Sequence, residues 1–297
     1  MLAIHMYDGL ACVAFAQGYA GPPVMMLEHK DETFYVGASV VDFRMNGRRA
    51  GRADGARRGN AHLPMYAALG LVSPRVELSR EAARAALGLR DEDVLLVSLG
   101  YKKKYSLLQL EMVARVLRQF PRARYVAVGP GAEWRPRVQQ LGLEKQIAAE
   151  DECDKTRADR LHAAADLYLD PFPMTGVISM FESGLAGAAV LSLCPWGPLH
   201  RTLCTEATDY ADAANQTALL ACPSRHQYER ALEALLGDVP ALRERGRRTR
   251  RLLEEVAHGA QWAQRVERFF EWAALQPLQP RDRPPAWVLN KTVLLQR

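Results

Sequence analysis

From about residue 77 to residue 193, short apolar runs of strand length alternate with segments whose apolar positions repeat at helical spacing. The pattern predicts strands over residues 94–99, 124–128, near 147, 167–169 and 190–193. It predicts helices between them over residues 81–87, 107–119, 134–141, 159–165 and 176–187. Because a helix separates each strand from the next, we expect an α/β fold with a doubly wound parallel sheet.

The two ends of the chain follow other patterns. Strand signals occur over residues 24–27 and 36–46, and the Gly-, Arg- and Pro-rich residues 47–74 have the composition of a connection between domains. Amphipathic helices are predicted over residues 228–236, 239–258 and 261–275, followed by an extended tail. We therefore expect an N-terminal domain over residues 1–75, a second domain over 76–258, and a C-terminal helix with its tail over 259–297.

Residues 166–193 are predicted to form a strand, a loop, a helix and a second strand. Gly176 opens the helix and lets a ligand approach the backbone, and the first N–H groups of a helix attract an anion. Glu182 lies one to two turns into the helix, where a carboxylate is suited to accept two sugar hydroxyls. The pattern indicates a nucleotide site; the alternative is an ordinary crossover helix with Glu182 on its solvated face.

A basic segment follows the strand predicted at residues 94–99. Residues 100–105 read Gly-Tyr-Lys-Lys-Lys-Tyr, and Ser106 with Gln109 predicts a capping box for the next helix. Lysines between a strand end and a helix N-terminus favour an anion-binding loop, although a solvated basic loop is the alternative.

His29 and Asp31 directly follow the strand predicted at residues 24–27. Side chains at the carboxyl end of such a strand project into the ligand crevice of an open α/β sheet. Both are therefore candidates for acid–base catalysis, while a hydrogen-bonded structural role is the alternative for His29.

Composition narrows the cellular context and the partners. Of the 297 residues, 48% are apolar, and the net charge of +5 is carried mostly by arginine, which suits diphosphates, anionic membranes or nucleic acid. Aromatic residues do not interleave the basic ones, so we expect no nucleic-acid partner but leave peripheral membrane contact open. Five cysteines without a CxxC pair, no long apolar run and no signal-peptide pattern predict free thiols and a cytoplasmic protein.

Two motifs resemble the glycosyltransferases of the GT-B fold, and most closely the O-linked N-acetylglucosamine transferase type. The first comprises Ser98, Lys104, Ser106 and the helix running into residues 116–124. The second comprises Leu161, His162, Ala165, Asp166, Leu169, Asp170, Phe172, Pro173, Gly176, Leu185, Gly187 and Val190. Together they span roughly residues 90–240.

The resemblance implies a GT-B-like fold with a doubly wound C-terminal donor domain and a shortened N-terminal α/β domain. It implies transfer of a sugar from a nucleotide diphosphate sugar, with UDP as the default, to an acceptor hydroxyl of a glycan, lipid or protein. The donor contacts expected from it are Lys104, Gly129, Thr175, Gly176, Ser179 and Glu182. No metal or other cofactor is expected, because Lys104 and the helix N-terminus would stabilise the departing diphosphate.

The sequence also departs from the family pattern. Val177, Ile178 and Met180 stand where the family has threonines, so that only Ser179 retains a hydroxyl. Met174 stands where the retaining branch has a glutamate, which favours an inverting displacement. The alternatives are a non-catalytic nucleotide-sugar-binding subunit and a nucleotide-sugar epimerase on the same fold.

The N-terminal domain has about 75 residues, whereas a complete acceptor domain would need roughly 150 at the usual length of a βα pair. We therefore expect its sheet to have an unpaired edge and the chain to have weak transfer activity by itself. We expect either self-association through that edge or a gain of activity when an upstream segment is restored.

Overall fold

The computed structural model describes residues 2–5, 8–15, 21–28, 41–46, 78–195, 219–257 and 259–275. The chain forms two compact units, the first comprising Met1–Gly70 with Val256–Arg297 and the second comprising Leu71–Glu255. The boundary between the two units at residue 70 lies close to the domain boundary expected at residue 75. The C-terminal helix belongs to the same unit as the N-terminal residues.

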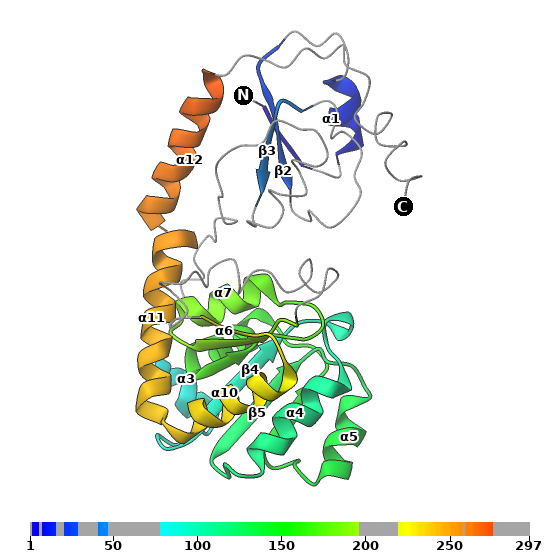
Figure 1. Cartoon of the computed structure of the whole chain (residues 1–297), viewed down its shortest axis with the longest axis vertical. Helices are drawn as coiled ribbons and strands as arrows, with labels where there is room; N and C mark the ends of the chain where they lie inside the picture. The colour runs from blue at the N-terminus through cyan, green and yellow to red at the C-terminus, as the bar shows by residue number, and fades with distance from the viewer. Residues whose placement is uncertain are drawn as a thin grey trace. The chain divides into compact units, whose positions relative to one another are not determined.

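The second unit contains a six-stranded parallel sheet (Figure 1). Its strands are β4 (Val94–Leu99), β5 (Ala123–Val128), β6 (Ile147–Glu150), β7 (Leu167–Leu169), β8 (Ala189–Leu193) and β9 (Leu219–Cys222). They lie in the order β6-β5-β4-β7-β8-β9, which is the 3-2-1-4-5-6 order of a doubly wound nucleotide-binding fold. The expected parallel sheet is confirmed, and β9 is a strand that the sequence pattern did not indicate.

Helices cover both faces of this sheet (Figure 1). They are α3 (Arg80–Ala86), α4 (Leu107–Leu117), α5 (Trp134–Leu141), α6 (Lys155–Ala164), α7 (Val177–Leu185), α10 (Arg225–Gly237) and α11 (Val239–Ala257). Alternate strand residues such as Leu96, Tyr125 and Leu191 pack with α4, α5 and α10 in the main hydrophobic core. On the opposite face, α6 contacts both α3 and α7.

Several helix ends have the expected local chemistry. The side chains of Ser79, Asp154 and Ser224 accept backbone N–H groups at the starts of α3, α6 and α10. Gly142 ends α5 with a φ of +67°, in the left-handed region that glycine tolerates. The expected capping box at α4 is wrong, because Ser106 makes no side-chain capping bond.

The first unit contains a three-stranded parallel sheet, β1 (Leu2–His5), β2 (Val24–Glu28) and β3 (Phe43–Asn46), with β2 in the middle. Helix α1 (Gly9–Ala14) follows β1, and α12 (Gly259–Ala274) completes the described elements. Phe269 and Ala273 of α12 are buried against Met25 and Phe43. The helix expected at residues 261–275 therefore supplies core residues to the N-terminal sheet. The sequence pattern did not predict β1 or α1.

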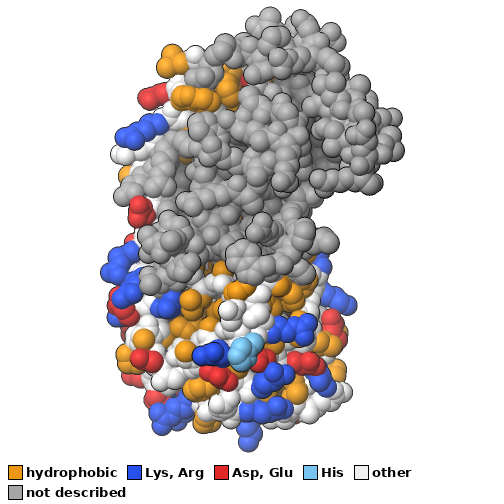
Figure 2. All heavy atoms as spheres, in the orientation of Figure 1, with side chains coloured by type: hydrophobic (Ala, Val, Ile, Leu, Met, Phe, Trp, Pro, Cys, Tyr) orange, Lys and Arg blue, Asp and Glu red, His pale blue; other side chains and the backbone are white. Residues whose placement is uncertain are grey.

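In the part of the chain that the structure describes, no helix is long and apolar enough to cross a membrane. On the face drawn in Figure 2, the basic and acidic side chains of the Leu71–Glu255 unit are interspersed.

Candidate donor site

The candidate site lies where the winding of the six-stranded sheet reverses. Strands β4 and β7 are neighbours, but the chain leaves β4 toward β5 and leaves β7 toward β8. The carboxyl ends of two such strands, where the following loops run in opposite directions, are the usual ligand site of an open α/β sheet. The loop of residues 100–105, here called the lysine loop, follows β4 after Leu99, and the loop from Asp170 to Gly176 follows β7 after Leu169.

Lys104 joins these two loops. Its Nζ donates to the carbonyl oxygen of Thr175 at 2.8 Å and lies 5.1 Å from the centre of the Tyr101 ring. Lys102, by contrast, is 74% exposed and lies 3.7 Å from a carboxylate oxygen of Glu133. One ammonium of the three-lysine run is thus held at the switch point beside the start of α7.

Asp170 fixes the loop that leads into α7. Its buried carboxylate accepts the Gly176 N–H at 2.7 Å and the Ser192 hydroxyl at 3.0 Å. Burial raises the pKa of Asp170, against the opposing effect of these donors, Thr175 and Lys104. A Cβ at Gly176 would lie 2.2 Å from the hydroxyl oxygen of Tyr168, so only glycine fits.

Gln109 also holds this loop. Its Nε2 donates to the carbonyl oxygen of Asp170 at 3.0 Å, and its Oε1 accepts the Phe172 N–H at 3.0 Å. The side chain is 1% exposed and reaches across from α4. Gln109 is therefore a loop clamp, although the sequence pattern assigned it to a capping box.

The N-terminus of α7 faces the same loop region. Gly176 is its N-cap and lacks a side-chain cap, so helix geometry leaves the Val177 and Ile178 amides without partners inside the helix. The Ser179 N–H donates to the Gly176 carbonyl at 2.8 Å, which closes the first turn. Glu182, further along α7, lies 3.2 Å from Nε2 of His162 and keeps 24% of its side chain exposed.

Gly129 has a structural reason to be glycine. Its φ is +76°, and a Cβ would lie 2.2 Å from the carbonyl oxygen of Gly100. The turns after β4 and β5 therefore pack backbone to backbone there. The remaining expected site residues, His29 and Asp31, lie outside the described residues; β2, which precedes them, ends at Glu28.

Asp166 lies immediately before β7, at the amino ends of the strands, and is the centre of an ion-pair cluster. Its fully buried carboxylate pairs with Arg80, with Arg84 at 3.0 Å and with Arg243 at 3.2 Å. It also accepts the N–H of Leu95 at 2.9 Å. Three basic residues distant from Asp166 in sequence meet there, so the cluster stabilises the unit at the edge away from the lysine loop.

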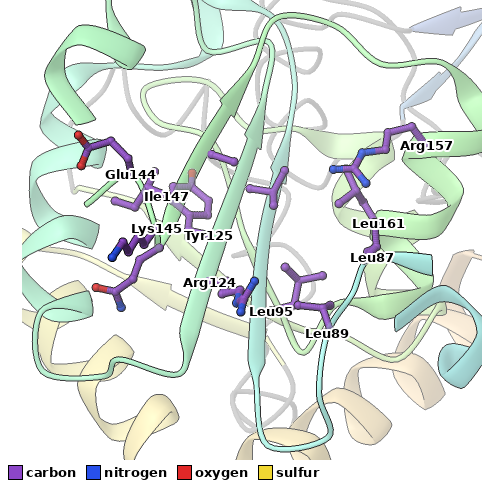
Figure 3. Close-up of a pocket in the computed structure, with 13 residues that line it drawn as sticks. Leu87, Leu89, Leu95, Arg124, Tyr125, Glu144, Lys145, Ile147, Arg157 and Leu161 are labelled. Carbon is purple, nitrogen blue, oxygen red and sulfur yellow. The ribbon is translucent and has the colours of Figure 1, made fainter. Parts of the chain in front are cut away.

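A cavity of about 160 Å³ also lies toward the amino ends of the strands (Figure 3). Its lining includes Leu95 of β4, Arg124 of β5 and Ile147 of β6. Since the lysine loop and the start of α7 lie at the carboxyl ends, this cavity is separate from the candidate site. Within the described ranges, no group of three His, Cys, Asp or Glu side chains could hold a metal ion.

A doubly wound parallel sheet with a lysine and a helix N-terminus at its switch point defines the class of nucleotide-binding α/β folds. Neither a protein-family model nor a curated protein matches the sequence. Among solved structures, sucrose-phosphate synthase from Thermosynechococcus elongatus is 16% identical with a TM-score of 0.65, over 91% of this chain and 73% of that one.

Two further solved structures are similar. HepE of Anabaena, crystallised with UDP and glucose, is 13% identical with a TM-score of 0.62, over 84% of this chain and 72% of that one. A mutant O-GlcNAc transferase from Thermobaculum terrenum is 15% identical with a TM-score of 0.59, over 86% of this chain and 49% of that one. The chain therefore has the fold of the GT-B glycosyltransferases, as the resemblance implied.

Proposed function

We propose that the protein is a glycosyltransferase that moves a sugar from a nucleoside diphosphate sugar, UDP by default, to an acceptor hydroxyl. The observation that carries the proposal is the contact of Lys104 with the Thr175 carbonyl, which sets an ammonium beside the N-terminus of α7 at the switch point. The binding of UDP and glucose by HepE, a protein of similar fold, supports the choice of donor.

In the proposed reaction the bond from the sugar C1 to the diphosphate breaks, and the diphosphate leaves with the electron pair. Lys104 and the amides of Val177 and Ile178 stabilise that developing charge, each well-placed donor contributing about 3 kcal/mol. No metal is required for this step. Glu182 accepts the ribose hydroxyls of the leaving nucleotide.

The acceptor oxygen forms the new bond to C1, and its proton passes to His29 or Asp31. A single displacement inverts C1, and Met174 at the position of the retaining branch's glutamate agrees with that course. We propose a glycan as the acceptor class, since a solved neighbour named TarM was crystallised with sugar ligands and UDP.

Mass spectrometry after incubation with UDP-sugars and candidate glycans, with and without EDTA, tests the proposal. We expect a glycosylated product, or slow donor hydrolysis without acceptor, that EDTA leaves unchanged, and NMR should show the inverted anomer. Isomerised donor would indicate an epimerase instead, and bound but unchanged donor would indicate a non-catalytic binding subunit.

A further inference from the structure

His162 of α6 lies between two side chains of α7. Its Nδ1 is 2.7 Å from the Ser183 hydroxyl oxygen, and its Nε2 is 3.2 Å from a carboxylate oxygen of Glu182. His162 is 1% exposed and Ser183 is fully buried, whereas the Glu182 side chain is 24% exposed. A buried imidazole thus lies against the carboxylate of a side chain that is partly exposed to solvent.

The chemistry of the three groups assigns the protons. An ionised carboxylate only accepts hydrogen bonds, so this contact requires a proton on Nε2 of His162. In a neutral imidazole, Nδ1 is then the acceptor, and the Ser183 hydroxyl donates to it. The Ser183 hydroxyl can donate or accept, so it satisfies Nδ1 in the tautomer that the Glu182 carboxylate requires.

The contact also restricts where the Glu182 carboxylate can lie. A glutamate on a helix surface samples many rotamers, and a ligand that needs one of them must order the side chain. Among the residues that the structure describes, His162 is the ion-pair partner of this carboxylate, and the Glu182 side chain keeps part of its surface exposed. The imidazole supplies the order before any ligand arrives.

We propose that His162 is a positioning residue that orients Glu182 to accept the ribose hydroxyls of the donor, with the Ser183 hydroxyl holding the imidazole ring through Nδ1. This inference rests on the proposed function, in which Glu182 binds the ribose. It adds a chain of contacts from Ser183 through His162 to Glu182 that links α6 to the nucleoside end of the donor, separate from the diphosphate contacts of Lys104.

Calorimetry on the full chain with UDP, 2′,3′-dideoxy-UDP and inorganic pyrophosphate tests this inference. The native chain should prefer UDP over the dideoxy ligand by about tenfold or more, as expected for charge-assisted hydrogen bonds. His162→Leu should reduce that preference to less than about threefold at unchanged pyrophosphate affinity. His162→Gln keeps an N–H donor and should restore most of the preference, and Ser183→Ala should give an intermediate value.

The outcomes separate the inference from the function. A native chain that binds no UDP, or binds both nucleotides equally, contradicts the ribose site and this inference with it. If His162→Leu keeps the native preference for UDP over the dideoxy ligand, the inference is overturned and the proposed function stands. The same holds if His162→Leu loses affinity for pyrophosphate as strongly as it loses affinity for UDP. If His162→Leu does not fold, Ser183→Ala and His162→Gln still decide, because native-like preference in Ser183→Ala together with lost preference in His162→Gln contradicts the inference.

Discussion

At the level of single residues, Lys104 and Lys102 stand two positions apart but have different surroundings. Lys104 is half-buried and bonded to the Thr175 carbonyl, whereas Lys102 is 74% exposed. We expect Lys104→Ala to weaken UDP binding about 10- to 100-fold, the worth of one charge-assisted hydrogen bond, and Lys102→Ala to change it less than twofold. Calorimetry on both variants measures the difference.

Equal losses in the two lysine variants would indicate a diffuse basic patch in place of a specific contact. Thermal melts without ligand control for folding, because Lys104 is half-buried whereas Lys102 is largely exposed.

At the level of elements, the side chain of Gln109 connects α4 to the loop after β7, and its removal should loosen that loop. Gln109→Ala removes the partners of the Phe172 N–H and the Asp170 carbonyl, each a loss of about 1–3 kcal/mol where the group stays buried. We expect faster hydrogen exchange at the Phe172 amide and weaker pyrophosphate binding. The matched control is Gln119→Ala, because Gln119 is exposed and bonds only Glu233 among the described side chains.

Unchanged exchange at Phe172 in the Gln109 variant would mean that the loop holds its position without the clamp, and that Asp170 and Lys104 suffice.

Strand and helix periodicity predicted most elements of the second unit, including β4 and α5 at their observed bounds. The pattern could also place Lys104 and Gly176 at strand ends, since those positions depend only on local order along the chain. It could not find the partners of Gln109 or Asp166, because these lie 61 to 86 positions away. Local sequence favoured a capping box for Gln109, and tertiary contacts overrode it.

We expect the ion pairs of Asp166 to contribute to the free energy of unfolding. Asp166→Ala leaves the buried guanidinium of Arg84 without its ionic partner, and losing one member of a buried pair costs about 3–5 kcal/mol. Urea unfolding should show that loss. Asp151→Ala is the control, because Asp151 pairs with Arg135 at 2.8 Å with both side chains more than half exposed, where a pair contributes about 0–1 kcal/mol.

A loss of less than about 1 kcal/mol in Asp166→Ala would show that water solvates the arginine side chains once the carboxylate is removed.

At the level of the whole molecule, each unit has a hydrophobic cluster of its own. The grouping of α12 with β2 and β3 was not visible in the sequence, because an amphipathic helix does not reveal which sheet it covers. The expected self-association through the N-terminal sheet stays a prediction, and light scattering of the full chain would measure it.

Two clusters favour two unfolding transitions, which scanning calorimetry should separate. UDP at 100 times its dissociation constant should stabilise the Leu71–Glu255 unit by about 2.7 kcal/mol and raise one Tm only. Phe269→Ala should destabilise the other unit by about 3–5 kcal/mol, because Phe269 is 2% exposed and packs on Met25 and Phe43. The UDP response should survive that substitution.

Phe270→Ala is the matched control, since the neighbouring Phe270 is 38% exposed and should shift either transition far less than Phe269→Ala does. A single cooperative transition moved by both UDP and Phe269→Ala would contradict independent unfolding of the units. Two transitions with UDP raising the one that Phe269→Ala lowers would instead place nucleotide binding in the N-terminal unit, and would overturn the donor site at Lys104 and α7.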